Sequence, residues 1–136
     1  QVVAVDLADD ACVHGAVLDL SGAVLERRKT PAGGRTGVAA VQAVTELCRE
    51  LVALATCPVL GVGVGSPGVV DPAGTVVQAP NRGWYDLPLA DDLGAALGLP
   101  VHVANDANTA ALGEFTYGGA GGGAAGKAFT RGRHYD

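Results

Sequence analysis

The first part of the chain is expected to form three strands when its apolar and polar positions are followed in order. Residues 2–7 form an apolar run broken only by Asp6, which predicts a buried strand. Residues 12–20 and 23–29 alternate apolar and polar side chains, as half-buried strands do. Gly22 tolerates the positive φ of a tight turn, so these two strands are expected to form a hairpin that turns at 19–22.

Helical spacing begins at Thr36 and then alternates with short strands. Apolar residues recur every three or four positions from residue 36 to about residue 55, with Thr36 as the expected N-cap. The elements expected after this helix are a buried strand at 59–65, a hairpin at 69–78, a helix at 87–97 closed by Gly98, a strand at 100–104 and a helix from Asn105 to about Thr116. This order predicts an α/β fold, a mixed sheet with flanking helices that begins antiparallel and continues parallel.

Composition fits one globular domain and excludes several classes of protein. The 136 residues carry a formal net charge of −5, with 49% apolar and 17% charged residues, which excludes a disordered acidic tail. Binding a phosphate backbone needs clustered Lys and Arg, so this stretch is not expected to bind nucleic acid. No run of about 18 apolar residues and no signal peptide is visible, which predicts a cytoplasmic protein that does not enter a membrane. The Gly-rich stretch at 121–136 is expected to be an irregular tail.

Two glycine patterns imitate nucleotide-binding motifs without their context. Residues 63–68 satisfy G-x-G-x-x-G, but a strand and a turn follow where the dinucleotide fingerprint requires a helix. Residues 121–127 match G-x-x-x-x-G-K, but Ala128 replaces the Ser or Thr that would bind magnesium. Neither pattern predicts a cofactor site.

Cysteine and histidine positions predict no metal site. Cys12, Cys48 and Cys57 show no C-x-x-C spacing, and no set of His, Cys and carboxylate residues has the spacing of known metal motifs. Cys48 lies among leucines of the first predicted helix, where a small buried residue is expected.

Polar residues follow two predicted strands where ligands bind in open α/β sheets. Asp106 comes directly after the strand at 100–104 and opens a helix, so it suits either a helix cap or a general base that accepts a hydroxyl proton. Asn81 follows the hairpin at 69–78 and suits either a turn or an amide that binds a vicinal diol. Nearby Trp84 fits a core position better than a sugar-stacking platform.

Taken together, these segments resemble the ROK family, which groups bacterial sugar-responsive transcriptional repressors with sugar kinases such as glucokinase. The resemblance rests on segments that recur in the family's order, namely residues 61–71, 79–81 with Trp84, 87–89, 99–101 and 105–114. It implies the N-terminal lobe of an actin-like, ribonuclease-H-like fold over residues 1–120. The resemblance also implies a small-molecule sugar as the partner, with the chain truncated at both ends.

The resemblance implies a role for five residues. Asp106 corresponds to the carboxylate that acts as the general base in kinase members. Asn81 and Asn105 correspond to amides that bind sugar hydroxyls, and Pro67 and Gly68 to a place where the backbone approaches the sugar. ATP and magnesium are implied only if the gene product is a kinase.

One departure from the family favours a regulator over a kinase. Kinase members begin with an Asp-x-Gly-Gly-Thr turn that binds ATP phosphate, whereas Asp6 and Leu7 are here followed by Ala8, Asp9 and Asp10. Extra carboxylates repel phosphate. We therefore expect the sugar-binding lobe of a ROK regulator that is not itself an enzyme, and the alternative is a fragment of an ATP-dependent hexose kinase.

Three family features are not found in these residues. They are the zinc motif, the second-half Glu and His of the sugar site, and the helix-turn-helix of repressor members. DNA contact is accordingly expected only through a domain upstream of this chain. Members of the family usually form dimers or tetramers, so the resemblance implies a homodimer.

Overall fold

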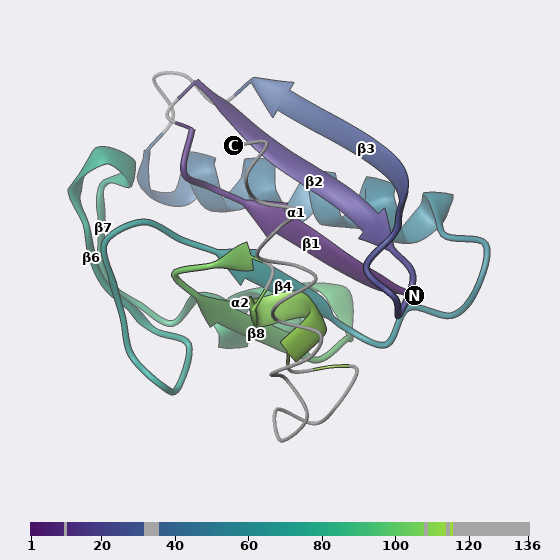
Figure 1. Ribbon diagram of the computed structural model, residues 1–136. Coiled ribbons are helices and arrows are strands. Elements are labelled where there is room, and N and C mark those ends of the chain that lie inside the picture. Colours follow the sequence, from purple (N-terminus) through teal and green to yellow (C-terminus); the bar gives the residue numbers. More distant parts are fainter. Residues whose placement is uncertain (10, 32–35, 108, 114, 116–136) are drawn as a thin grey trace.

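A computed structural model describes residues 1–9, 11–31, 36–107, 109–113 and 115. Its main feature is a five-stranded mixed sheet with the strand order β3-β2-β1-β4-β8 (Figure 1). These strands are β1 (Val2–Asp6), β2 (Cys12–Leu18), β3 (Val24–Pro31), β4 (Val62–Gly65) and β8 (Val101–Ala104). The predicted antiparallel start and parallel continuation are confirmed, because β1 pairs antiparallel with β2 and parallel with β4, and β4 pairs parallel with β8.

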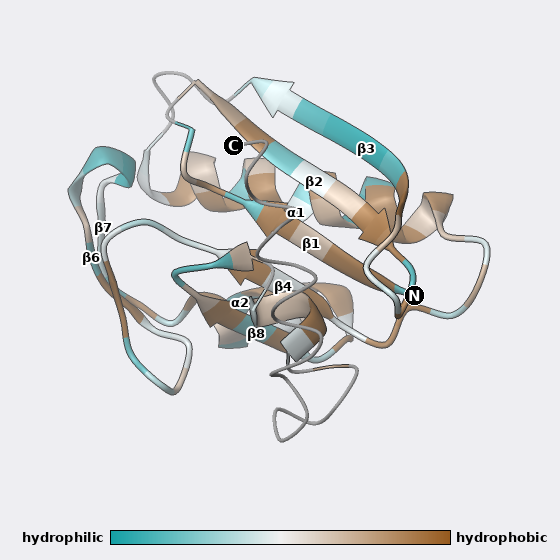
Figure 2. Cartoon of the chain, in the orientation of Figure 1, coloured by the Kyte–Doolittle hydropathy of each residue, from teal (hydrophilic) through white to brown (hydrophobic). Residues whose placement is uncertain are grey.

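The N-terminal hairpin closes as the sequence predicts. Gly22 has φ +93°, and the Asp19 carboxylate accepts hydrogen bonds from the backbone N–H groups of Ser21 and Ala23. The Ser21 hydroxyl bond to that carboxylate is the largest influence that lowers the Asp19 pKa. Outermost strand β3 is polar over most of its length, whereas β1 is apolar and buried (Figure 2).

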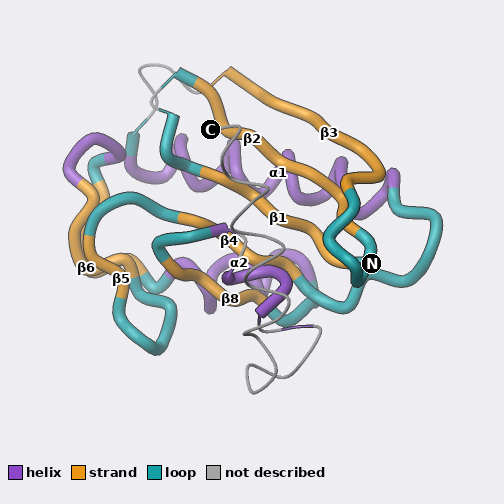
Figure 3. The backbone as a smooth tube through the Cα atoms, in the orientation of Figure 1, coloured by secondary structure: helices purple, strands orange, loops and turns teal. Residues whose placement is uncertain are grey.

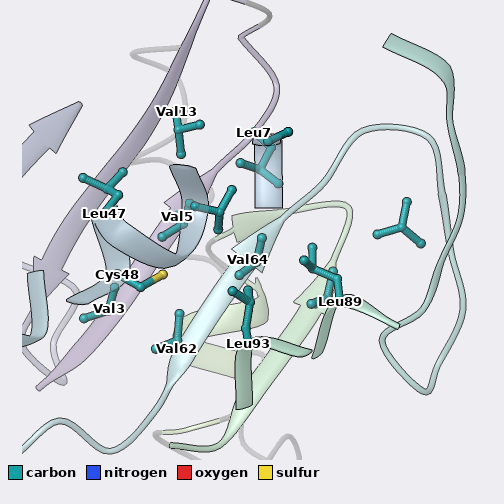
Figure 4. Packing of buried hydrophobic residues seen from close by; sticks show 14 of the residues in the cluster. Val3, Val5, Leu7, Val13, Leu47, Cys48, Val62, Val64, Leu89 and Leu93 are labelled. Atoms are coloured by element: carbon teal, nitrogen blue, oxygen red, sulfur yellow. The ribbon is translucent and has the colours of Figure 1, made fainter. Parts of the chain in front are cut away.

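Two helices cover one face of the sheet and enclose the main core. In α1 (Gly37–Leu54) the buried residues recur every three or four positions, which places one apolar stripe against the strands. Leu47 and Cys48 of this stripe lie among Val3 and Val5 of β1 (Figure 4). Helix α2 (Leu89–Leu97) adds Leu89 and Leu93 from the β8 side of the same core.

The opposite face carries the short helical segment η2 (Thr109–Gly113), which packs on β4. The glycines of β4 make this close approach possible. A methyl group added at Gly63 would meet the backbone of Ala110 and Ala111, and one at Gly65 would meet Ala107. The G-x-G pattern therefore serves the contact between helix and sheet, which accounts for it without a bound dinucleotide.

A second, three-stranded sheet lies beside the first and has the order β5-β6-β7 (Figure 3). It comprises β5 (Val69–Val70), β6 (Val76–Ala79) and β7 (Trp84–Leu87), with the 3-10 turn η1 (Pro80–Arg82) between the last two strands. The hairpin predicted at 69–78 is confirmed. The hydrophobic pattern predicts no strand between this hairpin and the next helix, but pairing with β6 makes a strand of residues 84–87.

Two local expectations are corrected by the structure. Thr36 stands at the N-cap of α1 with extended backbone but makes no capping hydrogen bond through its side chain, which lies against Gly83 instead. Residues 109–113 of the predicted last helix are of the π type. Residues 116–136, which include the expected tail, lie outside the described part of the chain. Within the described part, no helix combines the length and the apolar character needed to cross a bilayer.

Candidate functional site

The carboxyl ends of three parallel strands meet at one edge of the main sheet. Asp6 pairs with Gly65, and Gly65 pairs with Ala104, so β1, β4 and β8 end side by side. Three segments leave the sheet there, and they are the β1–β2 turn (residues 7–11), the 66–68 turn, and the start of the last helix at 105–107. Ligands of open α/β sheets bind outside such carboxyl ends, so this edge is the candidate site.

Asn105 holds the 66–68 turn in place. Its Nδ2 atom donates to the carbonyl oxygens of Ser66, at 3.0 Å, and Gly68, at 2.8 Å. An amide nitrogen carries two hydrogens, so both are used within the protein. The side-chain oxygen accepts no hydrogen bond from the other described residues, and a sugar-binding role for Asn105 stays a prediction that is limited to accepting a hydrogen bond.

Gly68 is at a position that only glycine fits. Its φ is +82°, and a methyl group added there would collide with the carbonyl oxygen of Gln78 and lie 3.1 Å from the Cα of Ala79. The turn thus presses its backbone against the end of β6, two residues before Asn81. Pro67 and Gly68 are therefore close to the segment that carries Asn81.

Arg82 ties that segment to the β1–β2 turn, and sequence reasoning missed it. The side chain is 2% exposed, and its Nη2 donates to the carbonyl oxygens of Leu7, at 3.1 Å, and Asp9, at 2.6 Å. Its Nε is buried and has no hydrogen-bond partner within the described residues. A guanidinium with several donors can join two backbone segments in this way, so η1 and the β1–β2 turn are held together.

The β1–β2 turn uses its own carboxylates to satisfy its backbone amides. Asp6 Oδ1 accepts from the Ala8 N–H and Asp9 Oδ1 from the Ala11 N–H, both at 2.8 Å. Asp9 Oδ2 lies 2.9 Å from His14 Nε2, and this hydrogen bond is the main reason that the pKa of Asp9 lies below its ordinary value. Two N–H groups that could meet an anion are thus already occupied, and negative charge surrounds them.

Asp106 and Asn81 complete the predicted set. Asp106 is half-buried at the beginning of the last helix, and its carbonyl oxygen accepts a hydrogen bond from the Ala110 N–H at 2.9 Å. Asn81 is exposed in η1, between the contacts made by Gly68 and Arg82. A carboxylate and an amide at this edge can bind sugar hydroxyls. For Asp106 the alternatives are sugar binding and a helix cap, and for Asn81 they are sugar binding and a turn.

Trp84 and Cys48 belong to the core, as predicted. Trp84 is 2% exposed, and its Nε1 donates to the carbonyl oxygen of Gly37 at 3.0 Å. Burial raises the pKa of the Cys48 thiol to about 12, which keeps it protonated and unreactive.

Comparison with known proteins places these features in a family. The model of the ROK family matches residues 2–125. A xylose repressor of Caldicellulosiruptor bescii is 43% identical over 61 residues, which is 44% of this chain and 15% of the repressor.

Among solved structures, a ROK family glucokinase from Streptomyces griseus is 34% identical with a TM-score of 0.71, covering 88% of this chain and 38% of that one. A ROK family transcriptional regulator, a homologue of the E. coli MLC protein, is 25% identical, also with a TM-score of 0.71, covering 80% and 28%. The chain spans well under half of each relative, and its fold is equally close to a kinase and a regulator.

Proposed function

Because the chain belongs to the ROK family, we propose that it is the sugar-binding lobe of a ROK transcriptional regulator. The observation that carries this proposal is the β1–β2 turn, whose Ala8 and Ala11 amides are occupied by Asp6 and Asp9. The resemblance implies that kinase members offer the amides of this turn to ATP phosphate. A turn closed by its own carboxylates fits ATP and magnesium poorly, because an incoming phosphate would have to displace them and meet their charge.

In this proposal the sugar lies at the carboxyl edge of the sheet, in the cytoplasm. Asp106 accepts a hydrogen bond from one sugar hydroxyl, Asn81 and the Asn105 oxygen bind others, and the backbone at Pro67 and Gly68 forms one wall. Arg82 joins this wall to the β1–β2 turn through its hydrogen bonds to Leu7 and Asp9. A sugar that moves the wall therefore moves the turn as well. DNA contact belongs to another domain of the gene product, and a second copy of the chain completes a homodimer.

Paired binding measurements on the purified gene product test this proposal. Calorimetry with a sugar panel that includes xylose and glucose should detect binding, which Asp106→Asn weakens. ATP should bind far more weakly than the sugar. Asp92→Asn is the matched control, because Asp92 is an exposed carboxylate of α2. Tight ATP binding, or sugar binding untouched by Asp106→Asn, would count against the proposal.

The second candidate is an ATP-dependent hexose kinase, which the retained Asp106 and the likeness to the Streptomyces griseus glucokinase support. A coupled assay for sugar-dependent ATP consumption distinguishes the two. The regulator proposal predicts no turnover for the wild-type protein. Turnover that is abolished in Asp106→Asn and retained in Asp92→Asn would establish the kinase instead.

A further inference from the structure

Three metal-ligating side chains converge where the β1–β2 turn enters β2. The ligand atoms of Asp9, Cys12 and His14 all lie within 4.8 Å of one another. The closest pair is Asp9 Oδ2 and His14 Nε2, at 2.9 Å. The spacing of these residues matches no familiar metal motif, because the carboxylate comes from a turn and the other two ligands from a strand.

The fold holds each of the three residues in position. Cys12 and His14 are two residues apart on β2, so their side chains share a face, opposite to the side chain of Val13 in the main core. Asp9 is fixed through its carbonyl oxygen, which accepts from Arg82 Nη2, and through Oδ1, which accepts from the Ala11 N–H. Oδ2 is therefore the oxygen that faces His14, and the Ala11 N–H bond to Oδ1 orients the carboxylate, as hydrogen bonds to metal ligands commonly do.

We propose that Asp9, Cys12 and His14 form a binding site for a thiophilic divalent ion of the zinc class, with one coordination position open to solvent. Zinc bonds of about 2.0–2.3 Å in a tetrahedron require ligand atoms roughly 3.3–3.8 Å apart, which these side chains reach by small rotations. One thiolate, one imidazole and one carboxylate suit zinc better than magnesium or calcium, which prefer oxygen ligands.

Access and charge agree with this assignment. The side chains of Asp9 and His14 are each 46% exposed, and Cys12 is a half-buried free thiol, so an ion can reach all three from solvent. A carboxylate and a thiolate together neutralise a divalent cation, so the filled site carries no net charge. The site takes neither a sugar nor a nucleotide as its ligand. It shares Asp9 with the turn on which the proposed function rests, but a metal titration of the protein requires neither sugar nor ATP binding.

Cobalt(II) substitution tests the site directly. The purified protein, reduced and freed of metal, is titrated with CoCl₂ and then with ZnCl₂. We expect one equivalent of cobalt to produce a thiolate-to-cobalt charge-transfer band in the near ultraviolet. Strong visible absorption of a four-coordinate ion should accompany it. Zinc, which binds such sites more tightly, should remove both. Failure of the wild-type protein to give a thiolate band overturns the proposal.

Variants identify the ligands. Cys12→Ser should abolish the charge-transfer band. Asp9→Asn and His14→Gln should each weaken cobalt binding at least tenfold, because loss of a ligand costs no less than loss of a residue that only orients one, about 10–100-fold. Cys57→Ser and His102→Gln are matched controls that should leave the spectrum unchanged. Emission of Trp84, the single tryptophan and a buried one, reports whether each variant is folded. A band that survives Cys12→Ser, or disappears in folded Cys57→Ser, assigns cobalt elsewhere and overturns the proposal.

Discussion

Replacing Gly63 by alanine tests whether the glycines of β4 hold the last helix against the sheet. The added methyl group would lie 2.5 Å from the carbonyl carbon of Ala110 and nearer still to the backbone of Ala111. Ordinary contact begins at 3.4 Å, so the helical segment must move away by about 1 Å. The colliding atoms are backbone, and no change of rotamer relieves the overlap. Displacement of η2 therefore shifts the backbone near Asp106, which lies just before it.

The magnitude follows from two opposing effects. Overpacking a tight contact costs about 1–3 kcal/mol, and the upper end applies because the backbone cannot rotate aside. Alanine restricts the unfolded chain more than glycine does, which returns about 0.5–1 kcal/mol. The net loss is about 2 kcal/mol in the free energy of unfolding, or roughly 8 °C in Tm for a domain of this size. Thermal melts followed by Trp84 fluorescence measure it.

Gly94→Ala is the matched control. Gly94 lies within α2, and the nearest atom to an added methyl is the carbonyl oxygen of Leu99 at 3.5 Å, an ordinary contact. Alanine in a helix interior should raise the free energy of unfolding by about 0.5–1 kcal/mol, opposite in sign to Gly63→Ala. If Gly63→Ala melts at the wild-type temperature or above it, the packing argument for β4 is refuted.

Three further predictions concern thiols, titration and the core. Cys57 is exposed and should react rapidly with a disulfide reagent. Cys48 is buried, with a pKa of about 12, and should react only on unfolding. Rapid modification of Cys48 in the folded protein would contradict its burial. The lowered Asp9 pKa means that its contribution to stability is present above the unfolded pKa and is lost as the pH falls through the lower, folded one. His14→Gln should move the Asp9 pKa upward in a carbon-detected NMR titration, and an unchanged value would show that the hydrogen bond is not its cause. Trp84→Phe loses the hydrogen bond to the Gly37 carbonyl and should lower the free energy of unfolding by about 1–3 kcal/mol. Urea unfolding followed by circular dichroism measures this loss, and an unchanged free energy would argue against that bond.

Local pattern predicts most of this fold because the deciding signals are short-range. The alternation on β2, the helical stripe of α1 and the turn glycine Gly22 need no knowledge of distant residues, and the structure confirms each of these elements. β7 was missed because its four residues become a strand only by pairing with β6. The π-type winding of η2 was missed because apolar spacing in so short a segment does not separate one helical winding from another.

The residues of the candidate site also separate into those that local motifs predict and those that depend on distant parts of the chain. Family motifs predicted Pro67, Gly68, Asn81, Asn105 and Asp106, and the structure brings their segments to one strand edge. Arg82 could not be predicted, because its carbonyl partners on Leu7 and Asp9 are more than seventy residues away and nothing local marks a guanidinium for burial. Asp9, Cys12 and His14 did leave a signal, a carboxylate just before two ligands at strand spacing, but it differs from the spacings of familiar metal motifs.

The strand order has a consequence for how the chain folds as it is synthesised. Among the strands of this sheet β1 is made first, yet it lies in the middle of the sheet, and Val3 pairs with Val62 on its second side. The meander of β1, β2 and β3 forms from neighbouring residues, whereas the other edge of β1 stays unpaired until α1 and β4 have left the ribosome. That edge belongs to a strand whose Val2, Val3 and Val5 are fully buried in the finished protein. The unpaired edge of β1 is thus exposed to aggregation between the synthesis of β3 and that of β4, and pairing with Val62 ends this period.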